Sequence, residues 1–372
     1  MSRWFFSIVL LLSPSFASAQ RPPAVTPASA DTVLERLPKG YASLVPQPAG
    51  GTTSKQDIQR LLTTAARTGD ARLATRTEAL LARFPPDTRD TEIIKARAFS
   101  AQHRHDFAGA LRLLDEAIKI NPRDAGARFS RAQIQLVQGR IDRARADCAA
   151  LALGVDTSEG LICLGALSLR TGNLQQSMAM ADRWLAQDKT NSGVRRYVLV
   201  MRAEAASRAG APDADQWFRE ALALDPQDVR TLSAYARHLY DNNRPREVIA
   251  LLARAPQTDG LTLQMALAAH ATKSPQGPAL IRSQGRRYAT AHAVGVDPEL
   301  RDEAEYLLTL KDDAAGALKL AQRNFETQRD HEDVALLRRA ALAAGRPDAL
   351  KPLDVWAASQ KMKLAPLDEV RQ

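Results

Sequence analysis

The sequence predicts an all-α fold, a right-handed α-solenoid of about eight helix-turn-helix repeats. Anchor residues between paired apolar helix patterns recur with steps of 34, 33, 37 and 34 residues, at Ala110, Ala144, Ser177, Ala214 and Val248. Pro122 and Pro226 each follow their anchor by 12 residues and end the second helix of a pair. A period near 34 built from two short helices is typical of stacked helical hairpins. We therefore expect the pairs to form one line with an open trough.

Composition agrees with short, closely packed helices. Of the 372 residues, 45% are hydrophobic but only 5% are aromatic, as expected where Ala and Leu carry the core. The formal charge of +9 is spread over 51 basic and 42 acidic residues. No dense basic run is interleaved with aromatic residues, so a solvated Arg-rich surface is favoured over a nucleic-acid-binding one.

The first 19 residues have the pattern of a secretory signal peptide. Arg3 precedes an apolar stretch from Trp4 to Leu12, and Ala17-Ser18-Ala19 forms a cleavage site before Gln20. That stretch is shorter than the about 20 residues needed to cross a bilayer. The pattern predicts a periplasmic or secreted protein, cleaved after Ala19 and without a transmembrane segment in the mature chain. Uncleaved anchoring at the amino terminus is the alternative.

A flexible Pro/Ala-rich leader is expected over residues 20–53, because six prolines and Gly50-Gly51 interrupt it. Repeats are expected over 54–360, most clearly over 91–256, and residues 361–372 form a C-terminal tail. Apolar stripes predict the first pair over 54–86, with its turn at Gly69-Asp70.

The later pairs follow the same plan. Helices over 92–103 and 107–120 form the second pair, which Asn121-Pro122 stops. The next four pairs have turns at Gly139, Gly172 and Gly210 and near Asn243. After Gly260 the phase blurs, and we expect pairs over 261–293, 299–327 and 332–360.

This layout resembles the tetratricopeptide repeat family, which favours small residues at repeat positions 8, 20 and 27, a bulky one at 24 and Pro at 32. A unit that starts at Thr91 places there Ala98, Ala110, Ala117, Leu114 and Pro122. A unit that starts at Arg195 places there Arg202, Ala214, Ala221, Phe218 and Pro226. The fourth unit has the family's Leu-Gly pair, Leu164-Gly165, but Lys189 replaces Pro, and the family's early Trp and Tyr are mostly missing.

The resemblance covers residues 54–360 and is closest to exported bacterial members of unassigned function. It implies a non-catalytic scaffold that binds protein partners, in which the first helix of each pair lines an inner groove. The inward residues are then Lys95, Phe99, Phe129, Gln133, Arg196, Arg230, Arg237 and Tyr240. The arginines would favour an acidic or extended segment of a partner. A solvated arginine row without a ligand is the alternative.

The two cysteines, Cys148 and Cys163, lie on helices expected to be neighbours in the stack. In an exported chain they form either a disulfide or a pair of buried thiols. His103 and His105 lie in a turn without further ligands nearby, so no metal site is expected there.

No phosphate-binding loop, zinc-protease helix or nucleophile elbow occurs, and no cofactor is expected. The favoured function is therefore protein–protein interaction, in assembly of an envelope or export complex. A polysaccharide or cell-wall binding accessory protein and a cryptic enzyme subunit are the alternatives.

Overall fold

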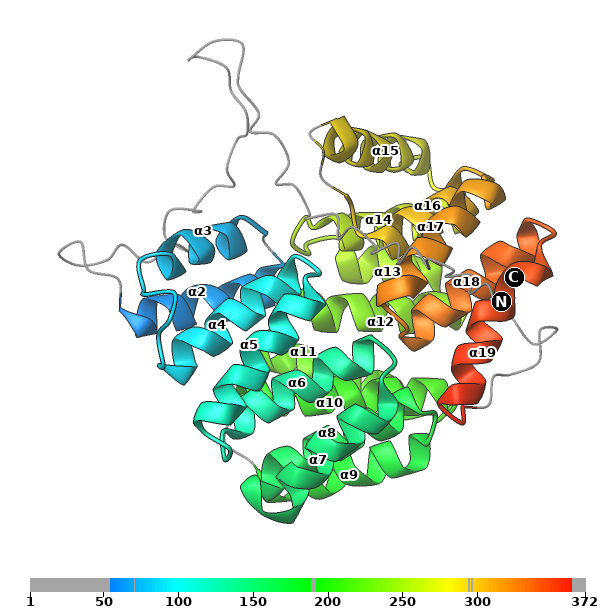
Figure 1. Cartoon of the computed structure of the whole chain (residues 1–372). Coiled ribbons are helices and arrows are strands. Elements are labelled where there is room, and N and C mark those ends of the chain that lie inside the picture. Colours follow the sequence, from blue (N-terminus) through cyan, green and yellow to red (C-terminus); the bar gives the residue numbers. More distant parts are fainter. Residues whose placement is uncertain (1–53, 70, 189–191, 294, 296, 363–372) are drawn as a thin grey trace, which may run out of the picture.

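The computed structural model describes residues 54–69, 71–188, 192–293, 295 and 297–362, and it is a succession of helices joined by short turns (Figure 1). The predicted signal peptide, the leader and residues 363–372 of the tail lie outside the described residues. Successive helices pack in pairs, and the described part contains nine pairs where the sequence predicted about eight. None of its helices is long and apolar enough to cross a bilayer.

The helix bounds follow the predicted pairs. They are α2 (Lys55–Thr68) with α3 (Ala71–Leu81), α4 (Thr91–His103) with α5 (Phe107–Ile120), α6 (Ala125–Val137) with α7 (Ile141–Ala150), α8 (Thr157–Arg170) with α9 (Leu174–Gln187), α10 (Ser192–Arg208) with α11 (Ala214–Leu224), α12 (Val229–Asp241) with α13 (Pro245–Leu252), α14 (Asp259–Ala271) with α15 (Gly277–Ala293), α16 (Leu300–Leu310) with α17 (Ala314–Thr327), and α18 (His331–Ala343) with α19 (Lys351–Ser359). A π-helical turn, η2 (Leu151–Val155), follows α7, and a 3-10 turn, η3 (Pro347–Leu350), precedes α19.

Aspartates cap the start of many of these helices. The Asp124 side chain accepts a hydrogen bond from the Ala127 N–H at 2.9 Å, and Asp106 accepts one from the Gly109 N–H at 2.8 Å. Such caps satisfy N–H groups that have no partner within the helix. They fix where each helix begins and so keep the pairs in step.

The turn inside each pair contains one residue with left-handed backbone geometry. Their φ angles lie between +52° and +80°, and the residues are Gly69, His105, Gly139, Gly172, Gly210, Asn243, Lys273, Asp312 and Gly345. His105, Asn243, Lys273 and Asp312 stand where the other pairs have glycine, so the geometry of the turn does not depend on a glycine. The turn geometry therefore repeats further along the chain than the sequence pattern does.

The anchor residues lie where helices cross. Ala110, Ala144, Ser177 and Val248 have no exposed surface, and Ala214 is 1% exposed. At Gly165 a Cβ would stand 2.8 Å from Cε of Met201, so α8 approaches α10 closely because this position has no side chain. Small residues at crossings let backbones approach, and larger ones fill the remaining space.

The first pair lies against the sixth. The guanidinium of Arg67 is 3.9 Å from the Asp225 carboxylate before α12, and a Cβ on Gly69 would touch Thr258 and Val229. Helices α2 and α12 are in contact although four pairs lie between theirs along the chain. The coil is therefore tight enough to bring the sixth pair into contact with the first pair.

The last pair likewise returns to the third and fourth. Nε1 of Trp356 donates to the Gly139 carbonyl at 3.1 Å, and the Arg329 N–H donates to the Val137 carbonyl at 2.7 Å. Arg170 of α8 forms a 2.6 Å ion pair with Asp330. The expected trough is therefore not open along its whole length, because contacts between distant pairs fill part of the inner side of the coil.

Candidate functional site

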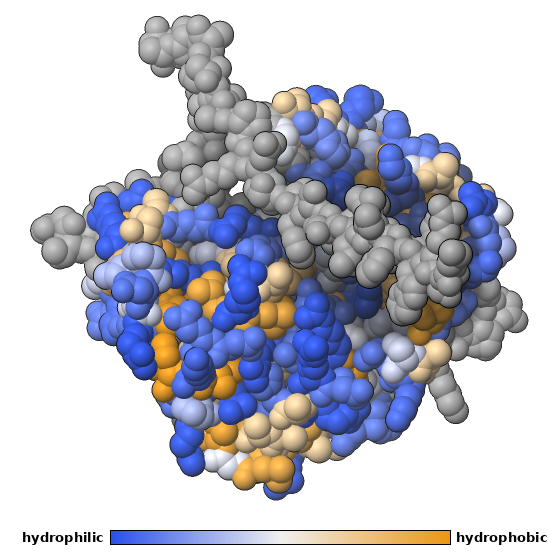
Figure 2. Space-filling model, in the orientation of Figure 1, coloured by the Kyte–Doolittle hydropathy of each residue, from blue (hydrophilic) through white to orange (hydrophobic). Residues whose placement is uncertain are grey.

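A groove of about 530 Å³ remains on the inner side of the coil. It lies between α2, α4, α6, α10 and α12, all first helices of their pairs. Its apolar lining includes Leu62, Ala66, Ala96, Phe99 and Val200. On the face seen in Figure 2, hydrophobic residues gather in patches between hydrophilic ones. The volume lies within the range of about 300–1,000 Å³ typical of ligand sites.

The structure divides the eight residues predicted for the groove into three sets. Lys95, Phe99, Arg196 and Arg230 line the groove itself. Two more contact Tyr197, which also lines it: Phe129 packs edge-on against the tyrosine ring, and Gln133 accepts a hydrogen bond from its hydroxyl at 3.3 Å. The last two, Arg237 and Tyr240, lie elsewhere.

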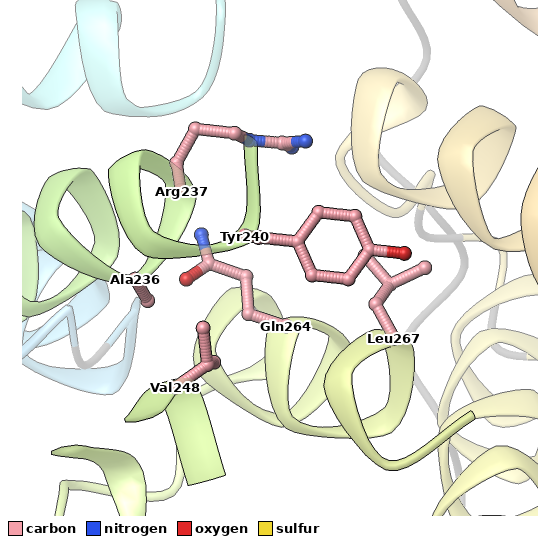
Figure 3. Close-up of a pocket in the computed structure, with 6 residues that line it drawn as sticks. All are labelled: Ala236, Arg237, Tyr240, Val248, Gln264 and Leu267. Atoms are coloured by element: carbon pink, nitrogen blue, oxygen red, sulfur yellow. The ribbon is translucent and has the colours of Figure 1, made fainter. Parts of the chain in front are cut away.

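Arg237 and Tyr240 border a separate small cavity between α12, α13 and α14. Figure 3 shows them projecting from α12, with Gln264 and Leu267 facing them from α14. The cavity volume is about 10 Å³, which is about the space of one water molecule. Arg237 and Tyr240 therefore lie apart from the groove that the other predicted residues line or support, and a part in partner binding stays a prediction.

Ion pairs within the chain occupy the inner side beyond α12. Arg339 of α18 donates to both oxygens of Glu305 on α16, at 2.9 and 3.1 Å. Arg301 of α16 lies 2.9 Å from Glu332. Although burial opposes ionisation, Arg301 and Arg237 hold the pKa of Glu332 at about 2. In this half of the interior, arginines and carboxylates of the chain are paired with one another.

In this half of the interior, burial disfavours the ionised form of the Asp302 carboxyl. Burial raises the pKa of Asp302 to about 6, even though Arg301 is nearby. An unfolded Asp ionises near pH 3.9, so between these values the folded state binds more protons than the unfolded state. The stability contributed by this proton is therefore present below pH 4 and lost as the pH rises through 6.

Asp302→Asn is expected to remove this loss. Relative to the parent, the free energy of unfolding of the variant should increase by up to about 3 kcal/mol between pH 4 and pH 7. Urea unfolding of both proteins at the two pH values measures it. Parallel pH profiles for parent and variant would contradict the assignment.

The cations of the groove differ in how they are paired. Lys95 lies 2.7 Å from Glu92 and 3.1 Å from Asp124. Arg196 lies 3.3 Å from Asp228 and 3.8 Å from Asp225. These two side chains are therefore held by carboxylates of the protein itself.

Arg230 rests on an aromatic ring instead. Its guanidinium carbon lies 4.7 Å from the ring centre of Tyr197, and Arg230 itself is exposed. Burial raises the pKa of the Tyr197 hydroxyl, with Arg230 as the largest opposing influence. Sequence reasoning missed Tyr197, although it directly follows the predicted groove residue Arg196 on the same helix.

Cys148 and Cys163 form a disulfide between α7 and α8. Both side chains have no exposed surface. The bond encloses the turn η2, whose Leu153 is 87% exposed. Of the two readings that the sequence left open, the structure contains the bonded one.

His105 joins two pairs that are distant along the chain. Its Nε2 lies 3.2 Å from the Glu299 carboxylate just before α16. The hydrogen bond that His105 donates to the Glu299 carboxylate raises the pKa of His105. Among the described residues no cluster of His, Cys, Asp and Glu is suited to hold a metal ion.

These features define an α-solenoid with a partly charged inner groove. Residues 101–153, from the end of α4 to η2, match the family model of the tetratricopeptide repeat. The helix pairs on either side of this segment have the same arrangement, so residues 101–153 are similar to the tetratricopeptide repeat and lie within an array of like pairs. Repeats of this family act as scaffolds for protein–protein interaction.

Comparison with known proteins adds similar folds. No curated protein matches the sequence. The chain is similar to pilF of Pseudomonas aeruginosa, with 18% identity over 54% of this chain and 94% of that one and a TM-score of 0.41. A tetratricopeptide repeat protein from Parabacteroides merdae ATCC 43184 is 13% identical over 77% of this chain and 98% of that protein, with a TM-score of 0.41. A chain of the APC/C hetero-tetramer Cut9-Hcn1 is 12% identical over 85% of this chain and 63% of that chain, with a TM-score of 0.49.

Proposed function

We propose that the protein is a non-catalytic, periplasmic or secreted scaffold that binds a protein partner in the groove between α2 and α12. The groove carries this proposal, because it is a space on the inner side that the protein's own ion pairs leave unfilled. The signal-peptide pattern of residues 1–19 supports export. A role in assembly of an envelope or export complex follows from such a location.

The apolar lining supports a protein partner. Leu62, Ala66 and Phe99 come from two different helices and offer apolar surface beside charged groups. Protein interfaces combine an apolar centre with a polar rim in this way. A short segment of a partner would bury its apolar side chains against these residues.

A groove-filling substitution tests this function. Ala66 is exposed on α2 and lines the groove, so Ala66→Trp places a large side chain where the partner segment would lie. The control is Glu116→Trp, an exposed position on α5 outside the groove. We expect crosslinking in the native compartment to capture a defined protein with parent and control, and at least about tenfold less of it with Ala66→Trp.

Two outcomes would contradict the proposal. One is equal capture of the same protein by both tryptophan variants, which would place binding outside the groove. The other is recovery of glycan alone, which would favour a polysaccharide-binding accessory protein. Circular dichroism of the two variants establishes that both are folded.

A further inference from the structure

We propose that the groove recognises a carboxylate of its partner at Arg230, and that the bound segment alternates acidic and apolar side chains. This inference rests on the proposed function and specifies the chemistry of the partner. It is carried by the charge pattern of the groove, by the support beneath Arg230 and by the apolar surface next to it.

The charge of the groove is unbalanced at one place. Four cationic side chains line it (Arg67, Lys95, Arg196 and Arg230) against two carboxylates (Glu92 and Asp228). The first three cations all have a carboxylate within 3.9 Å. In the part of the chain that the structure describes, Arg230 forms no ion pair with a carboxylate. Arg230 also acts through space on the carboxyl of Glu204, whose pKa is raised by burial. A ligand carboxylate would therefore be attracted to Arg230, which no carboxylate of the groove holds directly.

Contacts below Arg230 hold it in position before any ligand arrives. Tyr197 lies under the guanidinium, with its ring centre 4.7 Å away. The tyrosine is fixed in turn by Phe129, at 6.2 Å between ring centres, and by its hydrogen bond to Gln133. A stacked guanidinium keeps its N–H groups free at the ring edge, where they can donate two parallel hydrogen bonds to a carboxylate.

A second donor lies beside the same tyrosine. Nε2 of Gln133 is buried and has no hydrogen-bond partner among the described residues. A buried donor without a partner is costly, so an acceptor that enters between α6 and α10 would be stabilised there. This donor and Arg230 both favour oxygen acceptors on the ligand.

Apolar surface is present in the same groove. Phe99 of α4, which is half-buried, and Ala66 of α2, which is exposed, line the groove together with Arg230. A segment with acidic side chains only would leave this surface in water. A segment in which acidic and apolar side chains alternate satisfies both kinds of lining.

The test uses the full mature protein and a fluorescein-labelled probe peptide, Leu-Glu-Leu-Glu-Leu with an amidated carboxyl end. Fluorescence anisotropy measures its Kd. Arg230→Gln is expected to weaken binding about five- to tenfold, the size of a bidentate pair that is partly exposed to solvent. The matched control is Arg246→Gln, an exposed arginine on α13 outside the groove, which should bind like the parent.

A second probe peptide, in which Gln replaces both Glu residues, keeps the shape of the first and lacks its charge. It shows how much of the binding depends on charge. It should bind parent and Arg230→Gln equally weakly. Raising the ionic strength to about 1 M, where the screening length is about 3 Å, should remove the difference between parent and Arg230→Gln for the acidic probe.

Equal affinity of parent and Arg230→Gln for the acidic probe, or no binding of that probe to the parent, overturns the inference. The two proposals fail separately. If Ala66→Trp loses its partner while Arg230→Gln retains it, the groove binds protein but not through Arg230. If Ala66→Trp retains its partner, the proposed function itself is wrong.

Discussion

Replacing Trp356 by alanine is expected to destabilise the protein by about 3–5 kcal/mol and to expand it. Trp356 is 7% exposed, packs edge-on against Phe325 at 5.7 Å, and donates to the Gly139 carbonyl. Its removal leaves a cavity in the last pair and breaks the contact that ties this pair to the third. Urea unfolding measures the stability, and small-angle scattering should give a larger radius of gyration.

The neighbouring residue supplies the control. Val355 is 71% exposed on the same helix, so Val355→Ala should change the free energy of unfolding by no more than about 0.5 kcal/mol and leave the scattering unchanged. If Trp356→Ala leaves both the stability and the radius of gyration unchanged, the last pair does not close the coil.

The second large effect is expected from removing the disulfide. Cys148→Ala combined with Cys163→Ala should lower the free energy of unfolding by about 3 kcal/mol, because the bond closes a loop of 15 residues in the unfolded chain. Unfolding of parent and double variant, each with and without a reductant, measures this loss.

The reductant serves as the internal control. It should bring the parent close to the double variant and leave the variant unaffected. Titration of the denatured, unreduced parent should find no free thiols from Cys148 and Cys163. Two free thiols per chain, or an equal response of both proteins to the reductant, would contradict a stabilising bond.

Local features could be predicted from the sequence because they depend on residues within one repeat. The small anchors and the turn glycines each act within a few residues, so the positions of Ala110 and Gly139 sufficed to place their pairs. The neighbouring placement of Cys148 and Cys163 followed from the stacking order of adjacent helices.

The closure of the coil could not be predicted in this way. It depends on contacts such as Trp356 with Gly139, which are 217 residues apart. A small change in the rotation between successive pairs adds up over the array and decides whether the ends meet. For this reason Arg237 and Tyr240, placed correctly on a first helix, lie in a part of the interior that later helices fill.

The ion-pair partners of the groove arginines could not be predicted from the sequence either. Arg196 and Arg230 are equivalent in the sequence, as arginines on first helices of successive pairs. Only the structure distinguishes them, since Asp228 holds Arg196 while Tyr197 supports Arg230.

Site-specific photocrosslinking tests the central claim, that the groove is where a partner binds, most directly. A photoreactive amino acid is placed either at Ser130, which lines the groove, or at Glu116 on the outer surface of α5. After irradiation in the native compartment, we predict that one defined protein is crosslinked from Ser130 and not from Glu116. Crosslinking of that protein from Glu116 alone, or equally from both positions, would contradict binding in the groove.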